Sequence, residues 1–457
     1  MVDVNKNLEN LNKGIKELSS GIITQVGSYI DNGESTVEII IYIIIALVVV
    51  IFIIWAYGIT QQQNNECSNL KSIYSNTDNM IKPIGELNTD YDSSQQGLNT
   101  VAYTRQYQYK AKSPSDFAPP PTGPGRLFSY YVKTAYNCCS PGGFKNSFVD
   151  LCALQHAIRL GARCLDFEIY SEDYKPVVAT SIENQSLYNS FYIKETFNSL
   201  PLMDVLWYIN LYALGDNIPG DNTGAPNPTD PLFLHLRIMT NESSTINLIA
   251  KYLSDIFQNK LLGSAYGYTN YDVQKFGTLP LIQFCNKCII MVEDNKNQLQ
   301  TSTIYNSDLF PLINLMTSTD KFYLYREQTF KTQNPADMIS VNKNYVTMIL
   351  PNLTPDSANY DPRPAMQSGC QFVAMNFQNF DENLEVYFKI FDDVQHSFVL
   401  KQCKLRNIPQ HILIDPLPAI QINSACSQSA SITTGPIPTT IIVPSSIPSS
   451  IPSSIPN

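Results

Sequence analysis

Residues 163–170 read RCLDFEIY and directly follow a segment with helical periodicity, VDLCALQHAIRLGA. Successive side chains of a strand point to opposite faces, so Asp166 and Glu168 share one face and the apolar residues between them share the other. Two carboxylates two residues apart on a buried strand repel each other and lose hydration. The stretch therefore predicts a strand whose acidic face needs a metal ion, an arginine or a proton.

Strand-like and helix-like segments alternate on both sides of this stretch. Helices are predicted at 148–160, 200–214 and 244–261, and strands at 163–170, 175–180, 231–238 and 287–293. Such alternation is typical of a parallel sheet, and a chain of 457 residues is long enough for an α/β barrel with appendages. We therefore predict an α/β fold of the TIM-barrel type.

Composition bears on whether the chain binds nucleic acid and on the redox state of its cysteines. A net charge of −10 argues against a nucleic-acid partner, which would require a basic face. The ten cysteines are too few for a small-domain disulfide framework in a chain this long, and most lie in apolar contexts, so we predict reduced, buried thiols. Cys285 and Cys288 form a CxxC pair, but no second pair has zinc spacing, so we predict no metal there.

The N-terminal part carries two apolar patterns. Residues 1–36 space their apolar side chains by three and four, which predicts an amphipathic helix that lies on a surface or, alternatively, forms a short coiled-coil seam. Residues 37–59 contain a single charge, Glu38, and are long enough to cross a hydrocarbon core of roughly 30 Å. We predict a single-pass transmembrane helix. Lysines flank it on both sides, so its orientation stays open, with a slight preference for a cytoplasmic barrel.

Two segments lack the periodicity of a folded core. Residues 60–125 are rich in Gln, Asn, Ser and Pro, which predicts a polar tether between the membrane and the folded part. Residues 411–457 form a low-complexity tail in which SSIP occurs three times in succession at 445–456.

Two runs carry a resemblance to a known family. NLTPDSANYDPRPAMQSGCQFVAMNFQ at 352–378 and SFVLKQCKLR at 397–406 resemble the Y half of the barrel of eukaryotic phosphoinositide-specific phospholipase C. Residues 136–294 resemble the X half, with RCLDFE, KPVVAT and PLFLHLRI in the family's order. The resemblance implies a distorted TIM barrel with an X-like half at 126–295, a Y-like half at 296–410, and a site at the carboxyl ends of its strands.

The family's catalytic groups are not matched. The family uses one histidine as a general base on the inositol 2-hydroxyl and a second to stabilise the phosphorane and assist the leaving group. These positions fall on Tyr136 and Thr180, neither of which titrates near neutrality as imidazole does. Another histidine, His235, lies two residues before Arg237 and is interpreted as a packed core residue.

The family's calcium site is matched only in part. The resemblance places its asparagine on Asn137, two of its carboxylates on Asp166 and Glu168 with their lengths exchanged, and its third carboxylate on Arg237. Our hypothesis is that the Arg237 guanidinium takes the place of the ion, so that no metal is bound; calcium is expected only if the chain is an active enzyme. The alternative is a surface arginine at a strand end.

The family's substrate contacts are also missing. Its two lysines for the ring phosphates fall on Met291 and Glu293, and its substrate-contacting arginine and tyrosine fall on Met348 and Leu350. None of these four residues offers a cation to a phosphate. We therefore expect no intact substrate site.

These losses predict a pseudoenzyme: a membrane-anchored phospholipase-C-like barrel with a structural or binding role. Its expected partners are the bilayer and a protein partner or assembly, such as a virion. A competing hypothesis is an active phosphoric diester hydrolase in lipid metabolism, which would cleave a membrane lipid with a rearranged site. A third is a lipid-headgroup binder without turnover, against which the missing basic residues count.

Overall fold

The computed structural model describes residues 36–75, 127–182, 193–215, 224–226, 228–267, 281–293, 303–317, 322–392 and 396–406, together with the single residues 17, 20, 21 and 24. The C-terminal tail and most of the N-terminal amphipathic segment lie outside these residues. So does most of the tether, at 76–125.

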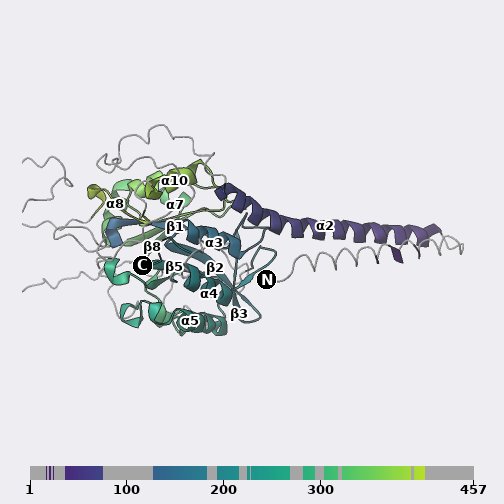
Figure 1. Ribbon diagram of the computed structural model, residues 1–457, viewed down its shortest axis with the longest axis horizontal. Coiled ribbons are helices and arrows are strands. Elements are labelled where there is room, and N and C mark those ends of the chain that lie inside the picture. The colour runs from purple at the N-terminus through teal and green to yellow at the C-terminus, as the bar shows by residue number, and fades with distance from the viewer. Residues whose placement is uncertain are drawn as a thin grey trace, which may run out of the picture. The chain divides into compact units, whose positions relative to one another are not determined.

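Eight parallel strands form a nearly closed barrel, as the alternation of elements predicted (Figure 1). They are β1 (Tyr130–Ala135), β2 (Cys164–Glu172), β5 (Leu232–Ile238), β6 (Cys288–Glu293), β7 (Leu315–Met316), β8 (Phe322–Arg326), β9 (Val346–Leu350) and β10 (Phe372–Met375). Neighbours follow the order β7-β6-β5-β2-β1-β10-β9-β8, so the seam of the described barrel lies between β7 and β8.

Three further strands extend this sheet. They are β3 (Lys175–Ala179), β4 (Leu200–Pro201) and β11 (Phe398–Leu400). The strand predicted at 175–180 is present as β3, but it runs antiparallel to β2. The reason is the connection: only Asp173 and Tyr174, both with positive φ, separate the two strands, and a turn this short makes a hairpin rather than a crossover.

Helices cover the outside of the barrel (Figure 1). They are α3 (Leu151–Arg159), α4 (Leu202–Tyr212), α5 (Ser243–Phe257), α7 (Glu327–Phe330), α8 (Pro335–Asn344), α9 (Arg363–Gln367) and α10 (Glu382–Asp392). Short 3-10 turns lie at Leu127–Ser129, Gln258–Lys260, Ser264–Tyr266, Leu281–Phe284, Phe310–Leu312 and Cys403–Leu405.

The side chains of β2 alternate between two apolar clusters, one on each face of the strand. Leu165, Phe167 and Ile169 belong to the larger cluster, which fills the space between the strands and the helices. The smaller cluster includes Phe233 and Phe372, whose rings meet edge to face at a centroid distance of 5.0 Å. The remaining positions of β2, including Asp166 and Glu168, therefore point into the barrel.

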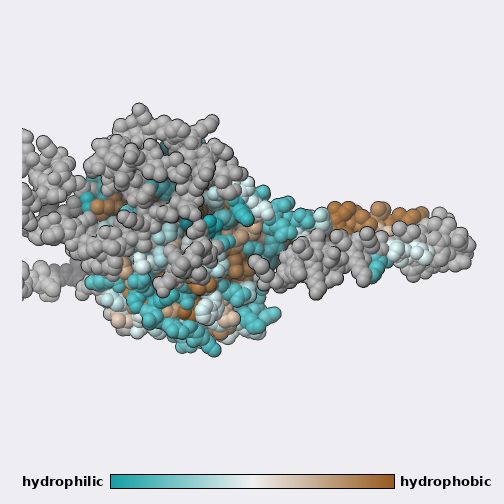
Figure 2. Space-filling model, in the orientation of Figure 1, coloured by the Kyte–Doolittle hydropathy of each residue, from teal (hydrophilic) through white to brown (hydrophobic). Residues whose placement is uncertain are grey.

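The apolar N-terminal segment belongs to one long helix, α2 (Thr36–Ser75). Its segment Ile40–Tyr74 is long and apolar enough to cross a membrane, and most of the large apolar side chains between Ile40 and Tyr57 are exposed (Figure 2). The helix continues past the apolar run through residues 60–75, a segment whose composition predicted a tether. These residues are helical because they pack on the barrel, a tertiary interaction that composition does not report.

Most of the cysteines that the structure describes follow the prediction. Six of them are free, and five of these six are buried. The prediction of reduced thiols is wrong for Cys67 and Cys152, which form a disulfide between α2 and α3. The two lie 85 residues apart in the sequence, so no local pattern indicates their pairing.

Candidate functional site

The acidic face of β2 lies beside two basic side chains of β5. The strands are parallel and in register, with Asp166 opposite His235 and Glu168 opposite Arg237. All four residues are at most 1% exposed. The register therefore places two carboxylates and their partners in the interior, near the carboxyl ends of the strands.

Arg237 lies between the two carboxylates. Its Nε donates to Asp166 Oδ1 at 3.0 Å and its Nη2 to Oδ2 at 2.8 Å, while Nη1 donates to Glu168 Oε1 at 2.5 Å. Nη2 also donates to Asn137 Oδ1 at 2.5 Å. The contact expected from the charge argument is confirmed, and a surface location for Arg237 is wrong.

The carboxylate oxygens also have partners other than Arg237. The Asn137 backbone N–H donates to Asp166 Oδ2 at 3.0 Å, and His235 Nδ1 lies 2.7 Å from Asp166 Oδ1. Glu168 Oε2 accepts from the Tyr170 hydroxyl at 2.7 Å and from the Ser181 backbone N–H at 2.9 Å. The acidic pair is thus fully hydrogen-bonded by protein groups.

This arrangement holds the charges in place. Burial alone would raise the pKa of Asp166, but the charge of Arg237 and the hydrogen bond with His235 outweigh burial and hold that pKa below its usual value. Burial would lower the pKa of Arg237, yet Asp166 and the other nearby groups raise it well above its usual value. The ion pair therefore stays charged across the physiological range.

The two positions matched to the family's histidines are occupied by hydroxyl side chains with fixed partners. Arg237 Cζ lies 4.6 Å from the centre of the Tyr136 ring, and the Tyr136 hydroxyl accepts from Arg326 Nη1 at 3.0 Å. Burial raises the pKa of Tyr136, so its hydroxyl remains protonated. Thr180 Oγ1 donates to the Phe144 carbonyl at 3.0 Å.

The positions matched to the family's substrate contacts lie along the strands β6 and β9. Met291, Met348 and Leu350 are fully buried and belong to the smaller apolar cluster. Glu293 ends β6, and its Oε2 has no hydrogen-bond partner among the described residues. These strands contribute apolar contacts and one carboxylate.

His235 lies deeper than the ion pair, as interpreted from its spacing. It is fully buried and meets the Phe322 ring edge to face at a centroid distance of 6.0 Å. Its Nε2 has no partner within the described part of the chain. The residue is packed in the core, with one nitrogen bonded to Asp166.

Sequence reasoning missed several members of this cluster. Tyr170 and Ser181 bind Glu168, and Arg326 binds Tyr136 from the end of β8. Burial would lower the pKa of Arg326, but Tyr136 and other groups raise it above its usual value. Tyr170 follows Asp166 and Glu168 on the same face of one strand, so strand alternation could have found it. Ser181 contributes only a backbone N–H, which no residue pattern reveals.

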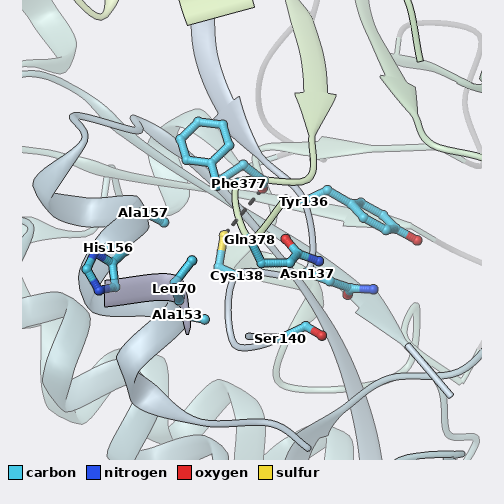
Figure 3. Close-up of a pocket in the computed structure, with 11 residues that line it drawn as sticks. Leu70, Tyr136, Asn137, Cys138, Ser140, Ala153, His156, Ala157, Phe377 and Gln378 are labelled. Atoms are coloured by element: carbon cyan, nitrogen blue, oxygen red, sulfur yellow. Dashed lines mark hydrogen bonds between the residues drawn. The ribbon is translucent and has the colours of Figure 1, made fainter. Parts of the chain in front are cut away.

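A small hollow lies beside the polar cluster (Figure 3). Leu70 of α2 and Ala153, His156 and Ala157 of α3 line one side. The rest of its lining comes from Ala135, Tyr136, Asn137, Cys138, Ser140, Phe377 and Gln378. Arg237 and the two carboxylates do not line it, so the hollow belongs to the α2 contact rather than to the acidic pair.

Comparison with known proteins identifies the second half of the barrel. Residues 313–403 match the family model of the phosphatidylinositol-specific phospholipase C Y domain. A 1-phosphatidylinositol 4,5-bisphosphate phosphodiesterase of Drosophila melanogaster is 27% identical over 107 residues, which are 23% of this chain and 8% of that protein. The human inactive phospholipase C-like protein 2 is 38% identical over 50 residues, 11% of this chain and 4% of that protein. The matches thus span less than a tenth of these relatives.

Solved structures give more distant matches. PLC21 of S. officinalis aligns with a TM-score of 0.48 and 18% identity, covering 62% of this chain and 38% of that one. A calcium-dependent phospholipase C from a Pseudomonas species aligns with a TM-score of 0.34 and 10% identity, covering 60% of this chain and 95% of that one. The chain thus contains a nearly closed barrel of eight parallel strands, and residues 313–403 of this barrel match the Y domain of phosphatidylinositol-specific phospholipase C.

Proposed function

We propose that this chain is a single-pass membrane protein whose phospholipase-C-like barrel does not hydrolyse phosphoinositides and has a structural or binding role. The observation that carries the proposal is Arg237, which donates hydrogen bonds to Asn137, Asp166 and Glu168 at once. A divalent cation that used the same oxygens would meet the guanidinium at hydrogen-bonding distance. The residues present therefore do not fit calcium.

The other family positions support the same proposal. A proton shuttle needs a group that titrates near neutrality, and Tyr136 and Thr180 do not. Recognition of a phosphorylated ring needs cations, and Met291, Met348 and Leu350 offer none. The residues at these matched positions therefore supply neither the proton shuttle nor the phosphate-binding cations of the family's reaction.

The competing hydrolase hypothesis depends on the contact between His235 and Asp166. A histidine oriented by a carboxylate is a common general base. Here the imidazole is fully buried against Phe322, and Asp166 is already bonded to Arg237. A substrate hydroxyl could reach His235 only if the core opened.

Membrane anchoring and binding each have support of their own. The helix α2 contains about 20 consecutive apolar residues, the length that crosses a bilayer, and most of their large side chains are exposed. On the barrel, Met203, Trp207 and Leu211 are spaced four apart along α4 and are 41%, 54% and 50% exposed. Exposed apolar stripes of this kind are typical of surfaces that meet other macromolecules, which favours a protein partner.

The test is an activity assay on the full chain in lipid nanodiscs. With phosphatidylinositol or its bisphosphate and millimolar calcium, it should release no more inositol phosphate than protein-free nanodiscs. An active phospholipase C serves as the positive control. Turnover that disappears in the His235→Ala variant would contradict the proposal and favour the rearranged hydrolase.

A further inference from the structure

The helix α2 is attached to the barrel beyond its apolar run. Gln62 Nε2 donates to the Asn146 carbonyl at 3.1 Å, and the Ser147 hydroxyl donates to the Glu66 carboxylate at 2.9 Å. Further along, Leu70 is only 1% exposed. Tyr74 stacks on the His156 ring at a centroid distance of 5.4 Å. Residues 62–74 thus form part of the outer layer of the barrel.

A disulfide closes this contact. Cys67 and Cys152 have Cα atoms 6.1 Å apart, within the range that a disulfide spans. Both residues are only partly buried, whereas most of the free cysteines are fully buried. Burial raises the pKa of the free thiols of Cys139 and Cys288 well above their usual value, which keeps them protonated and unreactive. Among the described cysteines, a reductant or an oxidant therefore reaches the paired cysteines and Cys285 more readily than the buried thiols.

The contact lies at one end of the barrel. Asn146, Ser147 and Cys152 follow the carboxyl end of β1, and the Tyr74 hydroxyl donates to the Phe377 carbonyl, just after β10. The carboxyl ends of barrel strands form its mouth. Gln62 follows Ile59, the end of the apolar run, by three residues, or about 5 Å along a helix. The mouth end is therefore next to the membrane that α2 would cross.

We propose that the barrel lies on the oxidising side of this membrane and that the Cys67–Cys152 disulfide locks its mouth end to the membrane helix. The inference rests on the proposed membrane span. In a reducing cytosol, an accessible disulfide is reduced by the thiol pool, whereas outside it the bond persists. This reverses the slight preference for a cytoplasmic barrel that the lysine pattern gave.

Formation of the Cys67–Cys152 disulfide is a two-electron oxidation. The two thiols lose two protons and two electrons as the S–S bond forms. A disulfide-carrying oxidoreductase of the compartment accepts the electrons and is reduced to its dithiol. Neither Cys285 nor any buried free thiol takes part.

The first experiment tests the bond. A site-specific protease sequence is inserted between residues 76 and 126 of the full chain, which is made with endoplasmic reticulum microsomes. After cleavage in detergent, the two fragments should migrate together on a non-reducing gel and separate with dithiothreitol. In Cys152→Ser they should separate without reductant, whereas in the control Cys285→Ser they should stay together.

A metal ion bound at this position is the alternative to a disulfide. Ligand atoms of Cys67, Asp150 and Cys152 lie within 4.8 Å of one another, close enough to hold a cation. If a chelator alone makes both thiols react with a maleimide, a metal joins the helix to the barrel and the disulfide is overturned. Wild-type fragments that separate without reductant would overturn it as well.

The second experiment tests the side of the membrane. In sealed microsomes, protease should digest a tag at the N-terminus and spare a tag at the C-terminus until detergent is added. Digestion of the C-terminal tag with protection of the N-terminal tag would overturn the oxidising location. Digestion of both tags would mean that α2 does not cross the membrane, which would contradict the proposed function. The fragment assay tests the disulfide separately, so the two failures can be told apart.

Discussion

The strands β2 and β5 place charged side chains in the barrel interior, whereas β9 places apolar side chains there. On β2 and β5, Asp166, Glu168 and Arg237 form an ion-paired cluster in which every carboxylate oxygen has a partner. On β9, the inward positions are Val346, Met348 and Leu350, all fully buried in an apolar cluster. The match to the Y-domain family lies at 313–403, which includes β9 and excludes the ionic cluster. The family is therefore recognisable from the half that does not carry the acidic pair.

The matched half contains a polar network with a structural role. The Asn359 backbone N–H donates to Asp381 Oδ2 at 2.8 Å, and its side-chain amide donates to the Asn376 carbonyl at 3.1 Å. The Asn376 backbone N–H donates to Asn359 Oδ1 at 2.6 Å. Asp381 also accepts from the backbone N–H of Leu384 at 2.9 Å, near the start of α10. This network fixes the turns after β9 and β10, so a match here indicates the fold and not the chemistry.

Replacement of Arg237 with Ala should have the largest effect. It leaves Asp166 and Glu168 buried beside each other without a cation, at a cost on the order of 3–5 kcal/mol in the free energy of unfolding. Urea denaturation of the full chain in detergent, followed by circular dichroism, measures the loss. The control is Arg363→Ala, because Arg363 is about half exposed and pairs with Asp361 at the surface; it should change stability by less than about 1 kcal/mol. Equal losses in both variants would contradict a special role for Arg237.

Replacement of Arg237 with Glu should create a calcium response that the wild type lacks. The variant restores an asparagine and three carboxylates, a ligand set that suits a hard cation. It should be unstable without metal and gain about 2.7 kcal/mol at a calcium concentration 100 times its dissociation constant. Thermal melting with and without calcium measures this gain. If calcium stabilises the wild type and not the variant, the match of Arg237 to the family's third carboxylate is wrong.

Replacement of Asn359 with Ala tests the half of the barrel that matches the Y-domain family. It removes the acceptor of the Asn376 backbone N–H and two side-chain donations, and should cost on the order of 2 kcal/mol because a buried donor loses its partner. The same urea assay applies. The control Asn344→Ala, at the exposed end of α8, should cost less than about 1 kcal/mol. A neutral Asn359→Ala would mean that the matched half does not depend on this network.

The sequence was sufficient for the barrel and for the centre of the cluster, but for different reasons. Alternation along residues 163–170 placed the two carboxylates on one face, whereas the resemblance to the phospholipase C barrel placed Arg237 beside them, where the strand pairing has it. It was not sufficient for contacts between distant segments. The disulfide of Cys67 with Cys152 and the hydrogen bond of Arg326 with Tyr136 join residues 85 and 190 positions apart. Their proximity depends on how the helices and strands close around the barrel, which no local pattern encodes.

Replacement of Tyr136 with Phe should have the smallest effect. The ring that faces Arg237 remains, so only the hydrogen bond from Arg326 is lost. Arg326 Nη1 keeps its second acceptor, the Pro351 carbonyl at 2.9 Å, so the cost should be about 1 kcal/mol. The exposed Tyr174→Phe is the control and should be neutral in the same urea assay. A loss for Tyr136→Phe as large as that for Arg237→Ala would mean that the hydroxyl, and not only the guanidinium, holds the acidic pair in place.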